Sequence, residues 1–124
     1  MLPAPHRLTS AQDFSAVMGR RLRAGSATVV VNVRLVSHST GPRWRCGFIV
    51  SKAVGNAVVR HRTTRRLRHI VADLMRSRAV ELPEGFAADM VIRALPQAPA
   101  ADHTVLYADV ESSLRRALAK AVRP

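Results

Sequence analysis

The chain has few of the residues that would let it catalyse a reaction or cross-link itself. Its 124 residues include a single cysteine, Cys46, so an intramolecular disulfide and a cysteine-rich zinc site are both excluded. Only 8 Asp and Glu residues are present, and aromatic residues make up 4% of the chain. No hydrophobic run approaches the roughly 20 residues of a membrane span. These absences leave few candidates for an active site carried by the protein itself.

The carboxylates and histidines that are present do not form a recognisable active site. Asp109 and Glu111 lie two positions apart, and residues at that spacing on a helix do not face each other. His61 and His69 are two turns apart on one predicted helix, without the further ligands that zinc requires. The sequence also has no glycine-rich phosphate loop and no nucleophile-elbow serine. We therefore expect no catalytic residue and no metal site in this chain.

Positive charge is abundant instead. The chain has 20 Lys and Arg residues and a formal net charge of +12, and Lys52 and Lys120 are its only lysines. A charge of this size repels itself in the folded state and is typical of proteins that bind a polyanion. Because arginine can bind two phosphate oxygens at once and can stack on bases, the composition favours nucleic acid over an anionic membrane surface.

The length and apolar content predict one folded domain over residues 1–124, because a chain of this size can bury one core but not two. Residues 1–8 contain two prolines and little periodicity, which predicts a flexible N-terminal arm. The first residues also lack the hydrophobic segment of a signal peptide. We therefore expect a cytoplasmic protein.

Hydrophobic periodicity and turn residues predict six elements. They are helices over about 11–18, 57–76 and 107–122, and strands over about 28–36, 44–51 and 88–94. Gly41-Pro42 marks a turn that would join the first two strands as an antiparallel hairpin. The order predicts an α+β sandwich with a mixed sheet, and a further edge strand could lie in a segment where the pattern predicts a loop.

The strand predicted over 28–36 has two different faces. Alternation places four aliphatic side chains on one of them: Val29, Val31, Val33 and Leu35. The other face carries Val30, Asn32 and Arg34 and is less apolar. Because polar side chains on a sheet need water or a ligand, we expect this second face to line a cleft.

The segment over residues 51–68 combines a glycine turn with a strongly basic helix. Gly55-Asn56 ends the preceding strand, and Asn56 can cap the helix, whose free N–H groups suit an anion. Five arginines follow within nine residues: Arg60, Arg62, Arg65, Arg66 and Arg68. Helical spacing places Arg62, Arg65 and Arg68 opposite an apolar stripe and Arg60 and Arg66 near its borders. The stripe consists of Val59, Leu67, Ile70, Val71 and Leu74. Such a face can track an RNA backbone; the alternatives are a solvated basic face or a disordered basic tail, and the embedded apolar periodicity argues against the tail.

This segment resembles the signature of the bacterial ribonuclease P protein component, S-K-K-x-G-N-A-V-x-R-N-R-x-K-R-x-x-R. The matching residues are Ser51, Lys52, Gly55, Asn56, Ala57, Val58, Arg60, Arg62, Arg65 and Arg68. Family members also begin with an Arg-Leu and an acidic-Phe pair, which resemble Arg7-Leu8 and Asp13-Phe14. The chain departs from the pattern at Ala53, His61 and Thr64, which lowers the charge of the RNA face if histidine is counted as neutral.

The resemblance implies a fold and a division of labour. The fold would be a two-layer sandwich of about four strands and three helices, like the second domain of ribosomal protein S5. The partner RNA subunit would carry the active site and use Mg²⁺, and the holoenzyme would remove the 5′ leader of precursor tRNA. One protein would bind each RNA, with no membrane involved. The RNA-binding residues would be Lys52, Asn56, Arg60, His61, Arg62, Arg65, Arg66 and Arg68.

The family also holds the leader in a cleft between its first helix and the sheet. Here the matching cleft residues would be Phe14, Met18, Val30, Asn32 and Arg34. This cleft is less aromatic than usual for the family, so base stacking should contribute less to leader binding. By helical spacing alone, an apolar stripe such as that of Phe14 and Met18 more often belongs to a core than to a cleft.

Two other functions share these features. A structural RNA-binding module, such as a ribosomal protein, would have the same charge and basic helix without affecting precursor tRNA. A peripheral membrane protein would lay an amphipathic helix on anionic lipid, but the apolar face of this helix lacks aromatic residues and is needed for a core.

Overall fold

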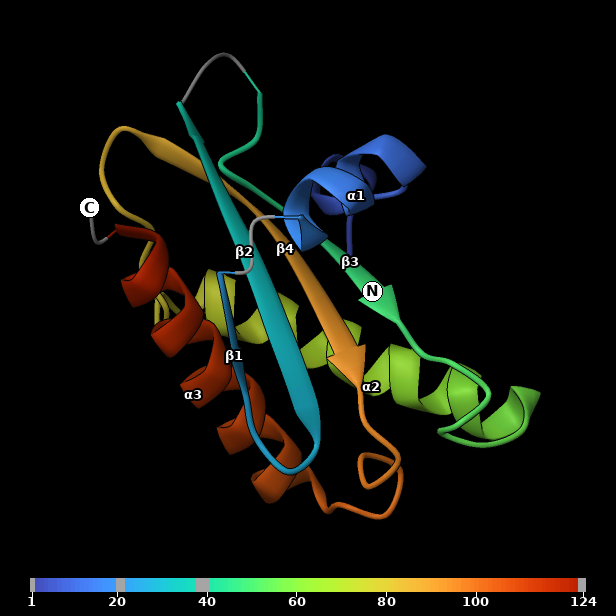
Figure 1. Ribbon diagram of the computed structural model, residues 1–124. Helices are drawn as coiled ribbons and strands as arrows, with labels where there is room; N and C mark the ends of the chain where they lie inside the picture. The colour runs from blue at the N-terminus through green and yellow to red at the C-terminus, as the bar shows by residue number, and fades with distance from the viewer. Residues whose placement is uncertain (1, 20–21, 38–40, 123–124) are drawn as a thin grey trace.

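The computed structural model describes residues 2–19, 22–37 and 41–122 (Figure 1). The elements are a 3-10 turn η1 (Ala4–His6), helices α1 (Ala11–Met18), α2 (Ala57–Arg76) and α3 (His103–Val122), and strands β1 (Arg23–Gly25), β2 (Val29–Ser37), β3 (Trp44–Ile49) and β4 (Phe86–Ala94). The strands form one sheet in the order β1-β2-β4-β3. The predicted α+β class, with a mixed sheet and three helices, is confirmed.

The predicted hairpin between the strands over 28–36 and 44–51, which are β2 and β3, is wrong. β4 lies between them, antiparallel to β2 and parallel to β3. β4 takes this central place because its run Ala88–Ile92 is buried on both faces of the sheet, as central strands usually are. Parallel strands need a crossover connection, and α2 provides it between β3 and β4.

Side-chain caps begin all three helices. Ser10 accepts a hydrogen bond from the Asp13 backbone N–H, and Asn56 accepts one from Val59 N–H at 2.9 Å. Asp102 accepts from Val105 N–H at 2.9 Å, so α3 begins at His103, four residues before the predicted start. The apolar repeat of this helix begins only at Leu106, and the earlier polar turn therefore gives no periodic signal.

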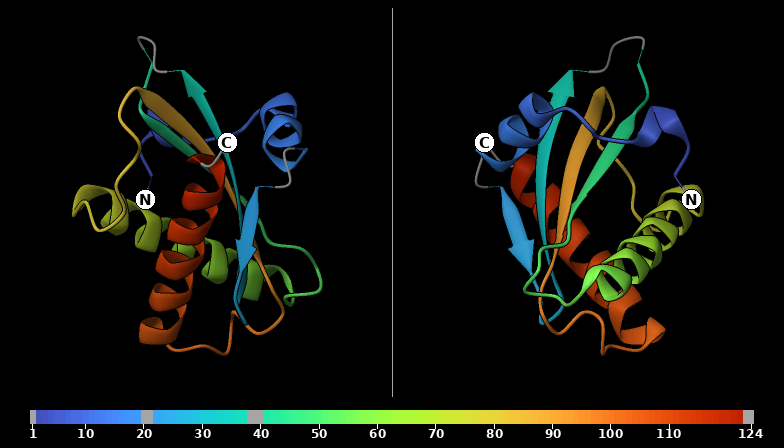
Figure 2. Two further views of the ribbon diagram at one scale, coloured as in Figure 1. Left: turned by 60° about the vertical axis from the view of Figure 1, so that its left-hand side comes forward. Right: turned by 90° about the vertical axis from the view of Figure 1, so that its right-hand side faces the viewer.

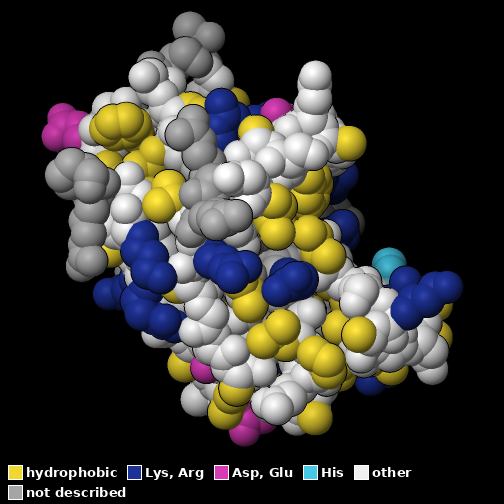
Figure 3. Space-filling view, in the orientation of Figure 1, with side chains coloured by type: hydrophobic (Ala, Val, Ile, Leu, Met, Phe, Trp, Pro, Cys, Tyr) yellow, Lys and Arg dark blue, Asp and Glu magenta, His cyan; other side chains and the backbone are white. Residues whose placement is uncertain are grey.

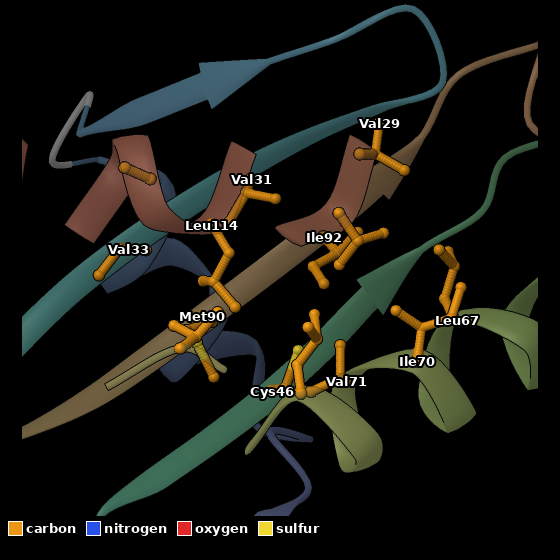
Figure 4. Packing of buried hydrophobic residues seen from close by; sticks show 14 of the residues in the cluster. Val29, Val31, Val33, Cys46, Leu67, Ile70, Val71, Met90, Ile92 and Leu114 are labelled. Carbon is orange, nitrogen blue, oxygen red and sulfur yellow. The ribbon is translucent and has the colours of Figure 1, made fainter. Parts of the chain in front are cut away.

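The main core lies between one face of the sheet and the helices α2 and α3. Val31 of β2 and Ile92 of β4 point toward Leu114 of α3 and Leu67 of α2 (Figure 4). The aliphatic face predicted for residues 28–36 is therefore confirmed at Val29, Val31 and Val33, each 0% exposed. The apolar stripe of α2 is buried against this face, and the basic side of the helix therefore points away from the sheet.

Helix α1 packs on the opposite face of the sheet, as the rotated views show (Figure 2). Its Val17 is fully buried and forms a small cluster with Leu8 and Val91, against which Phe14 and Met18 are half-buried. α1 contacts β2 and β4, and it lies over one end of these strands, so that no helix covers their other end on this face (Figure 1).

The N-terminal arm packs against the sheet edge at β3, whereas the sequence suggests a flexible segment. Leu2 is 1% exposed and belongs to the main core. The backbone of Arg7 forms a parallel β-bridge with that of Cys46. Its side-chain Nε donates a hydrogen bond to the Leu2 carbonyl at 2.9 Å. The ring of His6 stacks on Trp44 with centroids 3.8 Å apart. These contacts shield a sheet edge that would otherwise present unpaired backbone groups.

The other edge of the sheet is the additional strand β1, which lies outside the six elements predicted from the sequence. Its outward carbonyls accept side-chain hydrogen bonds from α3. Arg116 donates to the Gly25 carbonyl at 2.8 Å, and Lys120 donates to the Arg23 carbonyl at 2.7 Å. Two of the basic residues of α3 thus protect an edge strand.

Candidate RNA-binding surfaces

The chain enters α2 through a tight turn that requires glycine. Val54 N–H donates to the Ser51 carbonyl and Gly55 N–H to that of Lys52. Gly55 has φ +154°, and an added Cβ would lie 2.9 Å from Cγ1 of Val59. The turn leaves Lys52 exposed just before the helix. Asn56 is exposed, but its Oδ1 is the helix cap, which gives it a structural role in addition to any RNA contact.

The five motif arginines lie on two different flanks of α2. At about 100° per residue, Arg62, Arg65 and Arg66 face the side on which α3 lies. Arg60 and Arg68 lie on the other flank and are half-buried, and Arg60 Nε is buried without a hydrogen-bond partner among the described residues. His61, Arg62 and Arg65 are exposed.

Among the described residues, no carboxylate forms an ion pair with the five motif arginines of α2. Within the described part of the chain, ion pairs link carboxylates only to Arg45, Arg76 and Arg115. The positive charge of the five motif arginines is therefore available to an anion. Seen from the α1 side, Lys and Arg also gather along the middle of the molecule, and Asp and Glu are sparse (Figure 3).

Arg66 is held by the loop that precedes α3. One guanidinium nitrogen donates to the Ala101 carbonyl at 2.6 Å, and the other lies 3.4 and 3.5 Å from the carbonyls of Ala98 and Pro99. These contacts make Arg66 a positioning residue for the start of α3. An RNA contact by Arg66 stays a prediction. Some of the N–H donors of its guanidinium already bind backbone carbonyls of this loop.

A second polar contact joins α2 to α3, about one turn beyond the basic region of α2. Tyr107 donates to Asp73 at 2.6 Å, and Arg76 binds the same carboxylate at 2.9 Å. The hydrogen bonds from Tyr107 and Arg76 lower the pKa of Asp73, and the carboxylate raises the pKa of Tyr107 to about 12. The groove between the two helices is therefore fixed at both ends.

The sheet face on the α1 side carries the residues that are predicted to line the leader cleft. Phe14 of α1 lies over Gly47 of β3, where an added Cβ would overlap the ring and approach Cε1 to 2.8 Å. Asn32 is aligned with Val91 across β2 and β4 and is 3% exposed. Met18, Val30 and Arg34 are half-exposed on the same side. The structure thus places all five predicted cleft residues on this side of the sheet.

Arg93 is a cleft candidate that sequence reasoning missed. It is exposed on β4, in register with Val30 on β2 and Ile49 on β3, and alternation puts it on the same face as Val91. Arg23 of β1 is exposed opposite Asn32. Only the central position of β4 reveals that Arg93 shares a sheet face with the predicted cleft residues.

An ion-pair network fixes α1 to the sheet. Arg45 of β3 binds Asp89 of β4 through two hydrogen bonds of 2.9 and 2.8 Å, and its remaining nitrogen binds Asp13 of α1 at 3.1 Å. The hydrogen bond with Asp89 raises the pKa of Arg45. Because Asp13 directly precedes Phe14, the network sets where the aromatic ring meets the sheet.

Gly47→Ala is expected to displace the Phe14 ring and lower the free energy of unfolding by about 1–2 kcal/mol, as overpacking commonly does. Chemical denaturation measures this loss. Gly41→Ala is the matched control, because a Cβ at that position meets nothing within 4 Å. Equal stability of the two variants would contradict the packing of Phe14 on Gly47.

The remaining reactive groups offer no obvious chemistry. Burial raises the pKa of the Cys46 thiol, so it is a poor nucleophile. Among the described residues, no group of three or more His, Cys, Asp or Glu side chains could hold a metal ion. In that same part of the chain, no helix is long and apolar enough to cross a membrane.

Comparison with known proteins identifies relatives over the whole chain. The family model described as Ribonuclease P matches residues 2–118. The ribonuclease P protein component of Streptomyces avermitilis is 44% identical, with 99% of this chain and 100% of the relative aligned. That of Rhodococcus opacus is 47% identical, over 95% and 90% of the two chains. The RNase P protein structure from Staphylococcus aureus has a TM-score of 0.69 at 21% identity, covering 89% and 93%.

These findings agree with the resemblance in residues 51–68 and extend it to nearly the full length. They favour neither a ribosomal protein nor a peripheral membrane protein. At 21% identity the solved structure adds the shared fold. The chain belongs to the ribonuclease P protein family, and it is the protein component of the ribonucleoprotein endoribonuclease that forms the 5′ end of tRNA.

Proposed function

We propose that the two basic surfaces have different ligands. The arginine surface of α2, defined as Lys52, Asn56, Arg60, His61, Arg62, Arg65, Arg66 and Arg68, binds the ribonuclease P RNA. The cleft beside α1 binds the 5′ leader of precursor tRNA. The observation that carries the proposal is that α1 and α2 lie on opposite faces of one sheet, so one protein can contact both RNAs at once.

The leader cleft suits a single strand. Arg93 and Arg34 can follow phosphates, and Val30, Ile49 and Phe14 offer apolar surface to bases. Such a combination binds single-stranded nucleic acid with little sequence preference. With one aromatic ring in the cleft, charge should contribute more than stacking.

The chemistry belongs to the RNA subunit in this proposal, and Mg²⁺ assists hydrolysis there. The described residues do not form a carboxylate cluster of the kind that suits Mg²⁺, so no step is assigned to a metal on the protein. The protein instead neutralises packed phosphates, which lowers the Mg²⁺ concentration that the holoenzyme needs. We further propose one protein per RNA and a cytoplasmic location.

Precursor tRNA cleavage at low Mg²⁺ by the ribonuclease P RNA of Streptomyces avermitilis, the source of a relative 44% identical to this chain, tests the proposal when it is measured with and without this protein. A large gain in cleavage at the mature 5′ end supports it. Tight binding to the RNA without a gain in cleavage would contradict it.

Arg93→Gln is expected to raise KM for a precursor with a long leader by roughly 5-fold, because the variant cannot form one charged hydrogen bond to a leader phosphate. It should change neither KM for a precursor with a one-nucleotide leader nor the affinity for ribonuclease P RNA. Steady-state cleavage of the two precursors measures this. An equal change in KM for both would show that Arg93 does not contact the leader.

A further inference from the structure

A pocket of about 650 Å³ lies between α2 and the first turn of α3. Seven residues line it: Val58, His61, Arg62, Arg65, Arg66, His69 and His103. Six of the seven carry a guanidinium or an imidazole, and none carries a carboxylate. Three of them, Val58, His69 and His103, are outside the set predicted from the sequence to bind RNA.

The composition of the pocket fits a phosphate group. Arg62 and Arg65 are exposed on its α2 wall and can give paired N–H donors to phosphate oxygens. An imidazole keeps at least one N–H donor in every ring form present near neutral pH. His69 from the same wall and His103 from the opposite wall can therefore add donors from two directions.

The far wall of the pocket is held in place before any ligand binds. Arg66 binds the carbonyls of Ala98, Pro99 and Ala101, just before α3. The Asp102 cap fixes the first turn of the helix, and the ring of His103 rests against that of Tyr107 with centroids 5.7 Å apart. A preformed site of this kind loses less conformational entropy on binding.

We propose that this pocket holds a backbone phosphate of the ribonuclease P RNA, with His69 and His103 as ligands beside Arg62 and Arg65. The inference rests on the proposed function and extends its RNA-binding surface from α2 to α3. It also gives Arg66 the role of a positioning residue, which shapes the pocket by holding the loop at residues 98–101. The shared chemistry is a phosphate group, so free phosphate is the competing ligand.

The test compares His69→Ala, His103→Ala and the control Thr104→Ala, an exposed neighbour that does not line the pocket. Affinity for the ribonuclease P RNA of Streptomyces avermitilis is measured by filter binding, and binding of inorganic phosphate is measured by NMR titration. Each histidine variant is expected to bind the RNA roughly 5-fold more weakly, and Thr104→Ala as tightly as the unchanged protein. Thermal unfolding confirms that the variants are folded.

Three other outcomes overturn the proposal in distinguishable ways. If the histidine variants keep full RNA affinity while Arg62→Ala and Arg65→Ala lose it, the histidines of the pocket do not bind RNA. The α2 surface would then still bind RNA without them. If the histidine variants lose only phosphate binding, the pocket takes free phosphate and not RNA. If neither the histidine nor the arginine variants lose RNA affinity, the proposed function of α2 fails as well.

Discussion

Arg45→Met is expected to lower the free energy of unfolding by about 3 kcal/mol, because it leaves a buried carboxylate without its partner. The Asp89 side chain is 5% exposed and receives two hydrogen bonds from Arg45. Asp13 loses its link to the sheet at the same time. Because Asp13 and Arg45 are about one-third exposed, water compensates part of their loss, and the buried Asp89 accounts for most of the effect.

Arg43→Met is the matched control for this loss. Arg43 also donates two hydrogen bonds, to the carbonyls of Pro83 and Phe86, but both bonds are exposed to water. Its replacement should cost less than about 1 kcal/mol. Adding Asp89→Leu to Arg45→Met should recover part of the stability. Equal losses for the two arginine variants in chemical denaturation would contradict the role of the buried pair.

Replacing Arg62 and Arg65 together by glutamine is expected to weaken binding of ribonuclease P RNA by roughly 30-fold, at about 1 kcal/mol for each charged hydrogen bond to phosphate that the variant cannot form. The slope of log affinity against log salt should fall by roughly two, because fewer counterions are released. Both side chains are exposed, so thermal stability should not change.

The matched control removes two charges beyond the pocket. Arg76 and Arg78 are exposed at and just after the C-terminal end of α2, and Arg76 is already paired with Asp73. The Arg76→Gln/Arg78→Gln variant has the same net charge as the first and should retain most of the affinity. If both double variants lose affinity equally, binding depends on net charge and not on the α2 surface.

The parts of the fold that depend on local pattern were predictable. The bounds of α2 followed from the Asn56 cap and the apolar stripe through Leu74, and α1 followed from its cap and Val17. The partner of β3 was not predictable, because strand pairing is set by contacts distant in sequence. The position of β4 between β2 and β3 depends on burial of both its faces, which an apolar run alone does not distinguish from other buried segments.

The candidate site divides in the same way. The motif predicted the turn at Gly55 and the exposure of Arg62 and Arg65, because the glycine marks the turn and helix periodicity places the arginines. It could not predict that Arg66 binds carbonyls from residues 98–101, or that His103 completes a pocket with α2. These arrangements depend on how α3 packs against α2.

Cross-linking from single cysteines tests most directly whether the two faces bind different RNAs. Native Cys46 is 2% exposed, and burial raises its pKa, so a thiol-linked photoreagent should label only a cysteine introduced by Arg65→Cys or Arg93→Cys. In the assembled holoenzyme with precursor tRNA, position 65 should cross-link to ribonuclease P RNA and position 93 to the 5′ leader. Cross-links from both positions to the same RNA would contradict the account.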